Sequence, residues 1–97
     1  MRIISRRTLQ EFWEIHPDAE QPLKAWLAEA KKAQWQNPND IKRTYRNASI
    51  VSDNRVVFNI KGNDYRLIVH VRYDIGILFI RFIGTHRQYD KIDANRI

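Results

Sequence analysis

Apolar residues in the first part of the chain recur at helical spacing. Ser5 is a typical helix N-cap residue and Pro17 is a typical stop, and between them lies an i, i+3, i+4 stripe of Leu9, Phe12 and Trp13. This spacing places the three side chains on one side of a helix. It therefore predicts a first amphipathic helix, capped by Ser5, that ends before Pro17.

Two more helices are expected before residue 45. A second stripe follows Asp18 at the same spacing and consists of Leu23, Trp26, Leu27 and Ala30. The segment "NPND" then offers Asn37 as a cap and Pro38 at the first helical position, which is typical of a new helix start. This short third helix is predicted to end near Thr44.

From about Ser49 the hydrophobic period changes to two. Three segments rich in Val, Ile, Phe and Tyr, namely "RVVFNI", "YRLIVHVRY" and "GILFIRFIGT", are separated by "KGND" and "DIG", each with a glycine for positive φ. They predict a three-stranded antiparallel meander, with "ASIVS" and residues 2–4 as extra edge strands. The predicted fold class is α+β, with two to three N-terminal helices packed on one antiparallel β-sheet.

Ninety-seven residues suffice for a single domain with one modest core. We expect one domain over residues 1–97, with a helical half at about 5–44, a β-meander at about 49–85 and a C-terminal turn at 86–92. The opening "MRIISRRTLQEFWEIH" lacks the apolar core of a signal peptide, and no apolar run approaches the ~20 residues of a membrane span. A cytoplasmic location without membrane association is therefore expected.

Alternation divides the predicted sheet into two faces. The face expected to cover the helices carries Val56, Phe58, Ile60, Leu67, Val69, Val71, Leu78, Ile80 and Phe82. The opposite face carries Arg55, Val57, Asn59, Lys61, Arg66, Ile68, His70, Arg72, Ile77, Phe79, Arg81 and Ile83. A face that met only water would carry more acids and fewer isoleucines. This second face is therefore predicted to hold a ligand that is anionic and partly flat.

Charge supports an anionic partner and composition excludes several kinds of site. The formal net charge is +6, from 17 Lys and Arg against 11 Asp and Glu. The absence of cysteine excludes disulfides, thiolate metal sites and a cysteine nucleophile. There is no GxxxxGK[ST] phosphate loop and no His/Asp/Glu cluster at metal-ligand spacing, so we expect no cofactor and no metal ion.

Five side chains form the candidate catalytic set, namely Lys61, Arg66, Arg81, His86 and Tyr89. The three cations lie on or beside the second face, and a helical turn at "HRQYD" would place His86 and Tyr89 on one side. Such a set suits cleavage of an RNA phosphodiester. A base removes the proton of the 2′-hydroxyl, an acid protonates the leaving 5′-oxygen, and cations stabilise the developing charge. The residues alone do not say whether His86 or Tyr89 is the base.

The segments "FNIKGNDYRLIV" and "FIRFIGTHRQYDKID" resemble a HigB-type toxin of a type II toxin–antitoxin pair, within the RelE superfamily of mRNA interferases. The resemblance covers almost the whole chain. It implies a RelE-like α+β fold and ribosome-dependent cleavage of mRNA in the A site of the small (30S) ribosomal subunit. It also implies a cognate HigA-type helix-turn-helix antitoxin, through which the complex binds operator DNA.

The resemblance also implies roles for particular residues. In the superfamily, lysines and arginines on the concave sheet face act with a tyrosine or histidine near the C-terminus. Carried over, Lys61, Arg66 and Arg81 become phosphate binders, and His86 with Tyr89 becomes the acid/base pair. Further RNA contacts are assigned to Asn59, Asn63, Arg72, Arg87 and Lys91. Asp90 matches the motif without an assigned role.

Two other functions are compatible with the same residues. A non-catalytic RNA-binding module would need only cations and flat platforms, which Phe79 and Trp35 would supply. A toxin of the same fold that acts on a protein such as gyrase is the second alternative, although the pair of His86 and Tyr89 argues against it.

Overall fold

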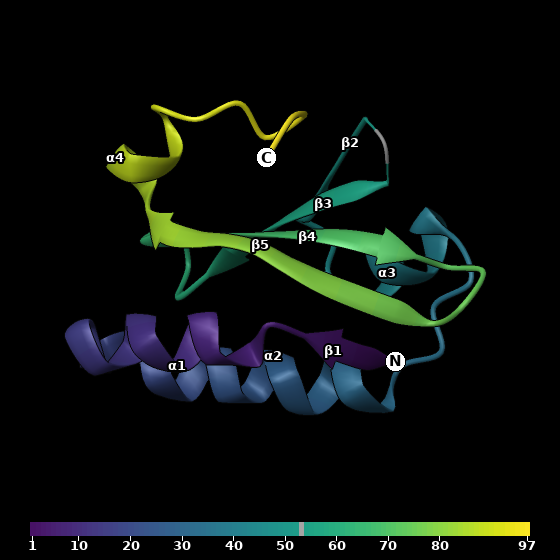
Figure 1. The fold of residues 1–97 in the computed structure, drawn as a ribbon, viewed down its shortest axis with the longest axis horizontal. Helices are drawn as coiled ribbons and strands as arrows, with labels where there is room; N and C mark the ends of the chain where they lie inside the picture. Colours follow the sequence, from purple (N-terminus) through teal and green to yellow (C-terminus); the bar gives the residue numbers. More distant parts are fainter. Residues whose placement is uncertain (53) are drawn as a thin grey trace.

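The computed structural model describes residues 1–52 and 54–97, which form a five-stranded sheet with helices on one face and the C-terminal segment on the other (Figure 1). The strands are β1 (Arg2–Ile4), β2 (Ser49–Val51), β3 (Arg55–Ile60), β4 (Tyr65–Arg72) and β5 (Ile77–Thr85). The helices are α1 (Arg6–Ile15), the 3-10 turn η1 (Pro17–Ala19), α2 (Glu20–Lys32), α3 (Pro38–Thr44) and α4 (His86–Tyr89).

The strand order is β1-β5-β4-β3-β2. Strands β2 to β5 pair as an antiparallel meander, whereas β1 lies parallel to β5 with Ile3 opposite Leu78. The α+β class is confirmed, and both expected extra strands are present. The sheet differs from the expectation in one respect: its parallel edge strand makes it mixed rather than wholly antiparallel.

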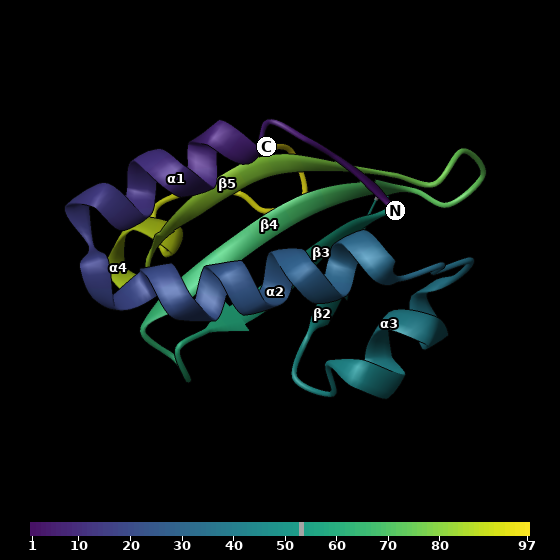
Figure 2. The ribbon, with the colours of Figure 1, turned by 90° about the horizontal axis from the view of Figure 1, so that it is seen from below.

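Helices α1 and α2 lie side by side across one face of the sheet, and α3 packs beside β2 and β3 (Figure 2). The apolar stripes predicted from the sequence supply buried contacts through Leu9, Leu23, Trp26, Leu27 and Ala30, and α3 adds Ile41. Removing this apolar surface from water is the main favourable term for the fold. Over residues 1–52 and 54–97, no helix has both the length and the apolar character needed to cross a membrane.

The helix starts agree with the predicted positions but not always with the predicted capping. The Asn37 side chain accepts a hydrogen bond from the backbone N–H of Asp40 at 3.1 Å, as expected for a cap of α3. Ser5 precedes α1 but adopts a left-handed backbone with φ of 71°, and within the described chain its side chain makes no capping bond. The expected Ser5 cap is wrong, because this residue turns the chain sharply from β1 into α1.

A β-bulge in β5 changes which face its last residues present. Ile68 lies opposite Phe82 and Val69 lies opposite Ile80, so Arg81 is an extra residue in β5. Beyond it the alternation is reversed: Phe82 packs with Ile68 on the second face, and Ile83 packs against the helical core. The expectation that Phe82 belongs to the core face and Ile83 to the open face is therefore wrong.

The segment after α4 runs back across the second face of the sheet (Figure 1). Ala94 is buried there with Val57 and Ile68, and Ile92 and Ile97 pack around them. The tail is also fixed by polar contacts. The Oδ1 atom of Asn95 accepts hydrogen bonds from the backbone N–H and hydroxyl of Ser52, at 3.2 and 2.8 Å, and Arg55 Nε donates to the carbonyl of Ile97 at 2.7 Å.

This covering corrects the expectation of an open second face. Val57 and Ile68 have exposed fractions of 3% and 0% because the chain's own C-terminal residues cover them. Of the isoleucines predicted for this face, Ile68 therefore serves a second small core. Of the predicted site residues, His86 and Tyr89 lie on α4, where β5 ends and the covering segment begins.

Candidate functional site

The short helix α4 begins directly at the end of β5 and is held by a capping box. The hydroxyl of Thr85 accepts a hydrogen bond from the backbone N–H of Gln88 at 3.1 Å, and the Gln88 side chain accepts from the backbone N–H of Thr85 at 2.9 Å. The backbone N–H of His86 also donates to the carbonyl of Asp64, at 3.2 Å. These bonds fix α4 above the β3–β4 turn, and the predicted helical turn at "HRQYD" is confirmed.

His86 is paired with Asp90 one helical turn later. The His86 Nδ1 atom lies 3.1 Å from Asp90 Oδ2, and both side chains are about half exposed. When Nδ1 donates its proton to this carboxylate, Nε2 of the neutral ring is the acceptor that remains for a proton. The carboxylate thus orients the imidazole.

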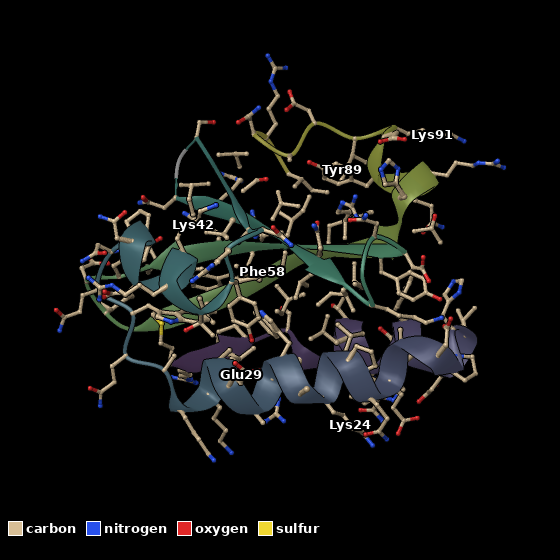
Figure 3. All side chains as sticks on the ribbon, turned by 180° about the vertical axis from the view of Figure 1, so that it is seen from behind. Lys24, Glu29, Lys42, Phe58, Tyr89 and Lys91 are labelled. Carbon is tan, nitrogen blue, oxygen red and sulfur yellow. The ribbon has the colours of Figure 1, made fainter. Side chains whose placement is uncertain are left out.

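Arg66 and Tyr89 form the other half of the cluster. Arg66 pairs with Gly84 across β4 and β5, and its guanidinium lies 6.0 Å from the centre of the Tyr89 ring. Figure 3 shows Tyr89 on the side of α4 that faces the sheet, whereas Lys91 points away from it. The Tyr89 ring packs on the second core, so its hydroxyl is held by a fixed ring beside a cation.

Gly84 leaves room for the Phe82 ring and the Gln88 side chain at the start of α4. A Cβ atom at this position would lie 2.5 Å from Cζ of Phe82 and 2.8 Å from Oε1 of Gln88. Neither distance is compatible with a real side-chain contact, so the ring of Phe82 occupies the space that a side chain would need. The glycine in "GTH" is therefore required by packing rather than by a special backbone angle.

The β3–β4 turn supplies polar groups next to Arg66. The Nη1 atom of Arg66 donates to the carbonyl of Asn63 at 2.9 Å, and Asn59, opposite Arg66 on β3, directs its Nδ2 atom toward the side-chain oxygen of Asn63 at 3.5 Å. Asn59, Asn63, Arg66, His86 and Tyr89 are thereby brought to one end of the sheet.

Lys61 lies nearby but is directed to the other side of the sheet. Its Nζ atom is 2.6 Å from Asp18 Oδ2 and 3.4 Å from Asp64 Oδ2, and Tyr65 also donates its hydroxyl proton to Asp18. The reason is local: Lys61 has a left-handed backbone with φ of 51°, which ends the alternation of β3. The hydrogen bond from Lys61 lowers the pKa of Asp18, and the same bond raises the pKa of Lys61.

The remaining predicted residues lie outside this cluster. Arg81 is exposed at the bulge of β5. Arg72 is at the opposite end of β4, six residues or about 20 Å from Arg66, where it forms a two-bond ion pair with Asp74. That pair raises the pKa of Arg72 and lowers the pKa of Asp74. Arg87 and Lys91 are exposed on and just after α4.

Two features of the site were not assigned from the sequence although signals were present. Asp90 is four residues after His86, which is the spacing of neighbours on a helix. "THRQ" has the T-x-x-Q spacing of a capping box.

Trp35, expected as a stacking platform, is instead 7% exposed and stacks on Phe58 in the core. It is not available to an RNA base in this structure.

The assembled groups can transfer protons and stabilise negative charge. His86, paired with Asp90, and Tyr89 carry groups that can gain or lose a proton. Arg66 is a cation beside the Tyr89 ring, held by its hydrogen bond to the Asn63 carbonyl. Over residues 1–52 and 54–97, no group of three or more His, Cys, Asp or Glu side chains is placed to hold a metal ion.

The sequence profile of the HigB toxin family, described as a RelE-like toxic component of a toxin–antitoxin system, matches residues 19–92. The chain belongs to this family. Similar relatives of this HigB-family chain are the mRNA interferase toxin HigB of Escherichia coli (strain K12) and the mRNA interferase HigB of Shigella flexneri. Each is 26% identical over 96 residues, which covers 97% of this chain and 92% of the relative. The resemblance noted in the sequence is thus confirmed, and the chain is a toxin of a toxin–antitoxin system.

Proposed function

We propose that this toxin is a ribosome-dependent mRNA endoribonuclease that inhibits translation. The observation that carries the proposal is the grouping of the His86–Asp90 pair with Tyr89 and Arg66 at one end of the sheet. The relatives named as mRNA interferases support the same substrate. A site of this kind acts on single-stranded RNA, whose 2′-hydroxyl supplies the nucleophile.

The proposed reaction uses two proton-transfer groups and one cation. The 2′-hydroxyl attacks the adjacent phosphorus as its proton is removed, and the bond to the 5′-oxygen breaks as that oxygen receives a proton. His86, oriented by Asp90, and Tyr89 carry these two transfers. Arg66 stabilises the negative charge that develops on the phosphate oxygens. Lys61 and Arg81 remain predictions as further phosphate contacts.

The proposed partners follow from the family. They are a HigA-type helix-turn-helix antitoxin, mRNA in the A site of the small ribosomal subunit, and operator DNA bound through the antitoxin, all in the cytoplasm. The reading frame next to this gene offers a simple check, because a small helix-turn-helix protein encoded there is expected to co-purify with the toxin. An adjacent product that fails to bind would contradict the assigned partner.

Conservative variants test the site directly. Tyr89→Phe keeps the ring on the second core and beside Arg66 but removes the hydroxyl, and His86→Gln keeps a polar side chain but removes the titratable group. We expect each to lower cleavage of mRNA on translating ribosomes by about 10²–10⁴-fold. Arg66→Ala is expected to lower it by about 10²-fold or more. Primer extension on the mRNA measures the loss.

Matched substitutions away from the cluster serve as controls. Tyr73→Phe removes a tyrosine hydroxyl and Arg43→Ala removes an exposed arginine of α3, and both should leave cleavage unchanged. Wild-type levels of cleavage in all three site variants would show that the assignment is wrong. Wild-type protein that cleaves mRNA without ribosomes would contradict the ribosome dependence alone.

A further inference from the structure

A polar cleft of about 310 Å³ lies at the edge of β3, outside the cluster that contains His86 and Tyr89. One wall is the segment 44–48, which connects α3 to β2, and the other wall is formed by Phe58, Asn59 and Gly62. Phe58 and Lys42, which lies on the neighbouring helix α3, are labelled in Figure 3. The size is at the lower end of the ~300–1,000 Å³ typical of small-molecule sites.

The cleft exists because β2 is shorter than β3. The pairing of β2 with β3 runs only from Val51 opposite Arg55 to Ser49 opposite Val57. In the part of the chain that the structure describes, Phe58, Asn59 and Ile60 have a strand neighbour on the β4 side only. An unpaired strand edge presents backbone donors and acceptors, which here border the cleft.

The 44–48 wall is held in place by its own contacts. Lys42 Nζ donates to the carbonyls of Arg46 and Ala48, each at 2.7 Å, and the backbone N–H of Ala48 donates to the carbonyl of Tyr45 at 3.1 Å. The Tyr45 ring meets Phe58 edge to face, with 5.1 Å between ring centres. A ligand therefore finds these groups already ordered, which reduces the entropic cost of binding.

The cleft adjoins the cluster through a row of paired residues. Gly84 on β5 lies opposite Arg66 on β4, and Arg66 lies opposite Asn59 on β3. Neighbouring strands are about 4.8 Å apart, so β5 and β3 are separated by about 10 Å. An RNA strand with one phosphate bound at Arg66 thus reaches the cleft within one or two nucleotides. Asn59 lines the cleft and also contacts Asn63 in the turn beside Arg66.

We propose that this cleft is a subsite for one base of a single-stranded RNA, next to the scissile phosphate. The proposal rests on the proposed function and adds Tyr45, Arg46 and Asn47 to the residues that meet the substrate. The residue types fit: the partly exposed Tyr45 ring, with amide and guanidinium groups beside it, suits a flat base with hydrogen-bonding edges. A negatively charged protein segment would find a single cation, Arg46, among the described residues that line the cleft.

The test compares cleavage patterns rather than total activity. Asn47→Ala removes a polar lining group, and Thr44→Phe fills the cleft from the end of α3. Asn39→Ala is the matched control, since it removes an exposed asparagine of α3 that does not line the cleft. Each protein is expressed during translation of a mixed mRNA pool, and the bases around every cut are counted.

We expect both cleft variants to cut mRNA still, but with at least about 5-fold weaker base preference at one position near the cut. Asn39→Ala should keep the wild-type pattern. An unchanged pattern in both cleft variants, with wild-type protein cutting normally, would overturn the subsite and leave the proposed function standing. Wild-type protein that cuts no mRNA would overturn the proposed function, and the subsite with it.

Discussion

At the scale of single residues, the Asp18 carboxylate fixes the turn beneath α4. It accepts hydrogen bonds from Lys61 and Tyr65, which begin and end the β3–β4 turn. In the same turn, the Asp64 carbonyl accepts a hydrogen bond from the start of α4 and the Asn63 carbonyl accepts one from Arg66. One exposed carboxylate on η1 therefore influences the position of the cluster without touching it.

This network predicts a dependence of stability on pH. The hydrogen bonds from Lys61 and Tyr65 hold the pKa of Asp18 below its ordinary 3.8, so its stabilisation is present above about pH 4 and is lost as the pH falls through the lower folded value. The urea midpoint of wild-type protein should therefore fall more steeply below pH 4 than that of Asp18→Asn. Glu14→Gln, an exposed change on α1, should follow wild type. Equal slopes for wild type and Asp18→Asn would contradict this role.

At the scale of elements, the tail at 91–97 supports α4 by packing in the second core together with Tyr89. α4 is only four residues long and lies at the end of a strand, and helices of that length are unstable alone. The capping box fixes the first turn of α4, and the packing of Tyr89, Ile92 and Ala94 on the second core fixes its end and the tail. The position of Tyr89 at the site therefore depends on the tail residues that share the second core with it.

A charge placed at Ala94 should detach the tail. Ala94→Asp would place a carboxylate in a small apolar contact at a cost of about 1–3 kcal/mol, and should loosen α4 as well. We expect faster amide hydrogen exchange at α4 and a large loss of cleavage. Arg96→Asp introduces the same group at a side chain that is 88% exposed and should change little. Unaltered exchange at α4 in Ala94→Asp would show that the tail does not support it.

The elements that the sequence predicted well are those that depend on a repeated pattern. Several side chains make up each apolar stripe in α1 and α2 and each alternation in β3 and β4. One exception therefore does not obscure the pattern. The bulge at Arg81 and the left-handed Lys61 are single-residue events that depend on neighbouring strands. The tail was missed because Ile92, Ala94 and Ile97 are too few to show a period. His86 and Tyr89 lie on one short helix as their spacing predicted. The direction of Lys61 was missed because its left-handed backbone ends the alternation of β3 and its partner Asp18 is distant in sequence.

At the scale of the whole molecule, the two sides of the sheet have different tasks. The main core and the helices α1 and α2 occupy one side, and the cluster at α4 occupies the other (Figure 1). The excess positive charge is spread over both sides, with Lys31 and Lys32 at the end of α2 and Arg87 and Lys91 around α4. Total charge alone therefore does not say which side attracts RNA.

Two double variants with the same total charge test whether the position of the positive charges matters for RNA binding. Arg87→Gln with Lys91→Gln, and Lys31→Gln with Lys32→Gln, each reduce the formal charge from +6 by two, to +4. We expect the first pair to lower the slope of log binding constant against log salt for single-stranded RNA by about 1.4, because two phosphate contacts are lost. The second pair should leave the slope near that of wild type. Equal effects of the two pairs would contradict a binding surface around α4.

The parallel pairing of β1 with β5 bears on when a newly made chain acquires this activity. Ile3 must meet Leu78, so the first strand has no partner in the sheet until most of the chain has been synthesised. The side chains of the cluster come later still, at His86 and Tyr89, and their support from Ala94 comes last. Contacts between residues so distant in sequence also form slowly. The side chains of the cluster can therefore take up their arrangement only after synthesis has passed Ala94.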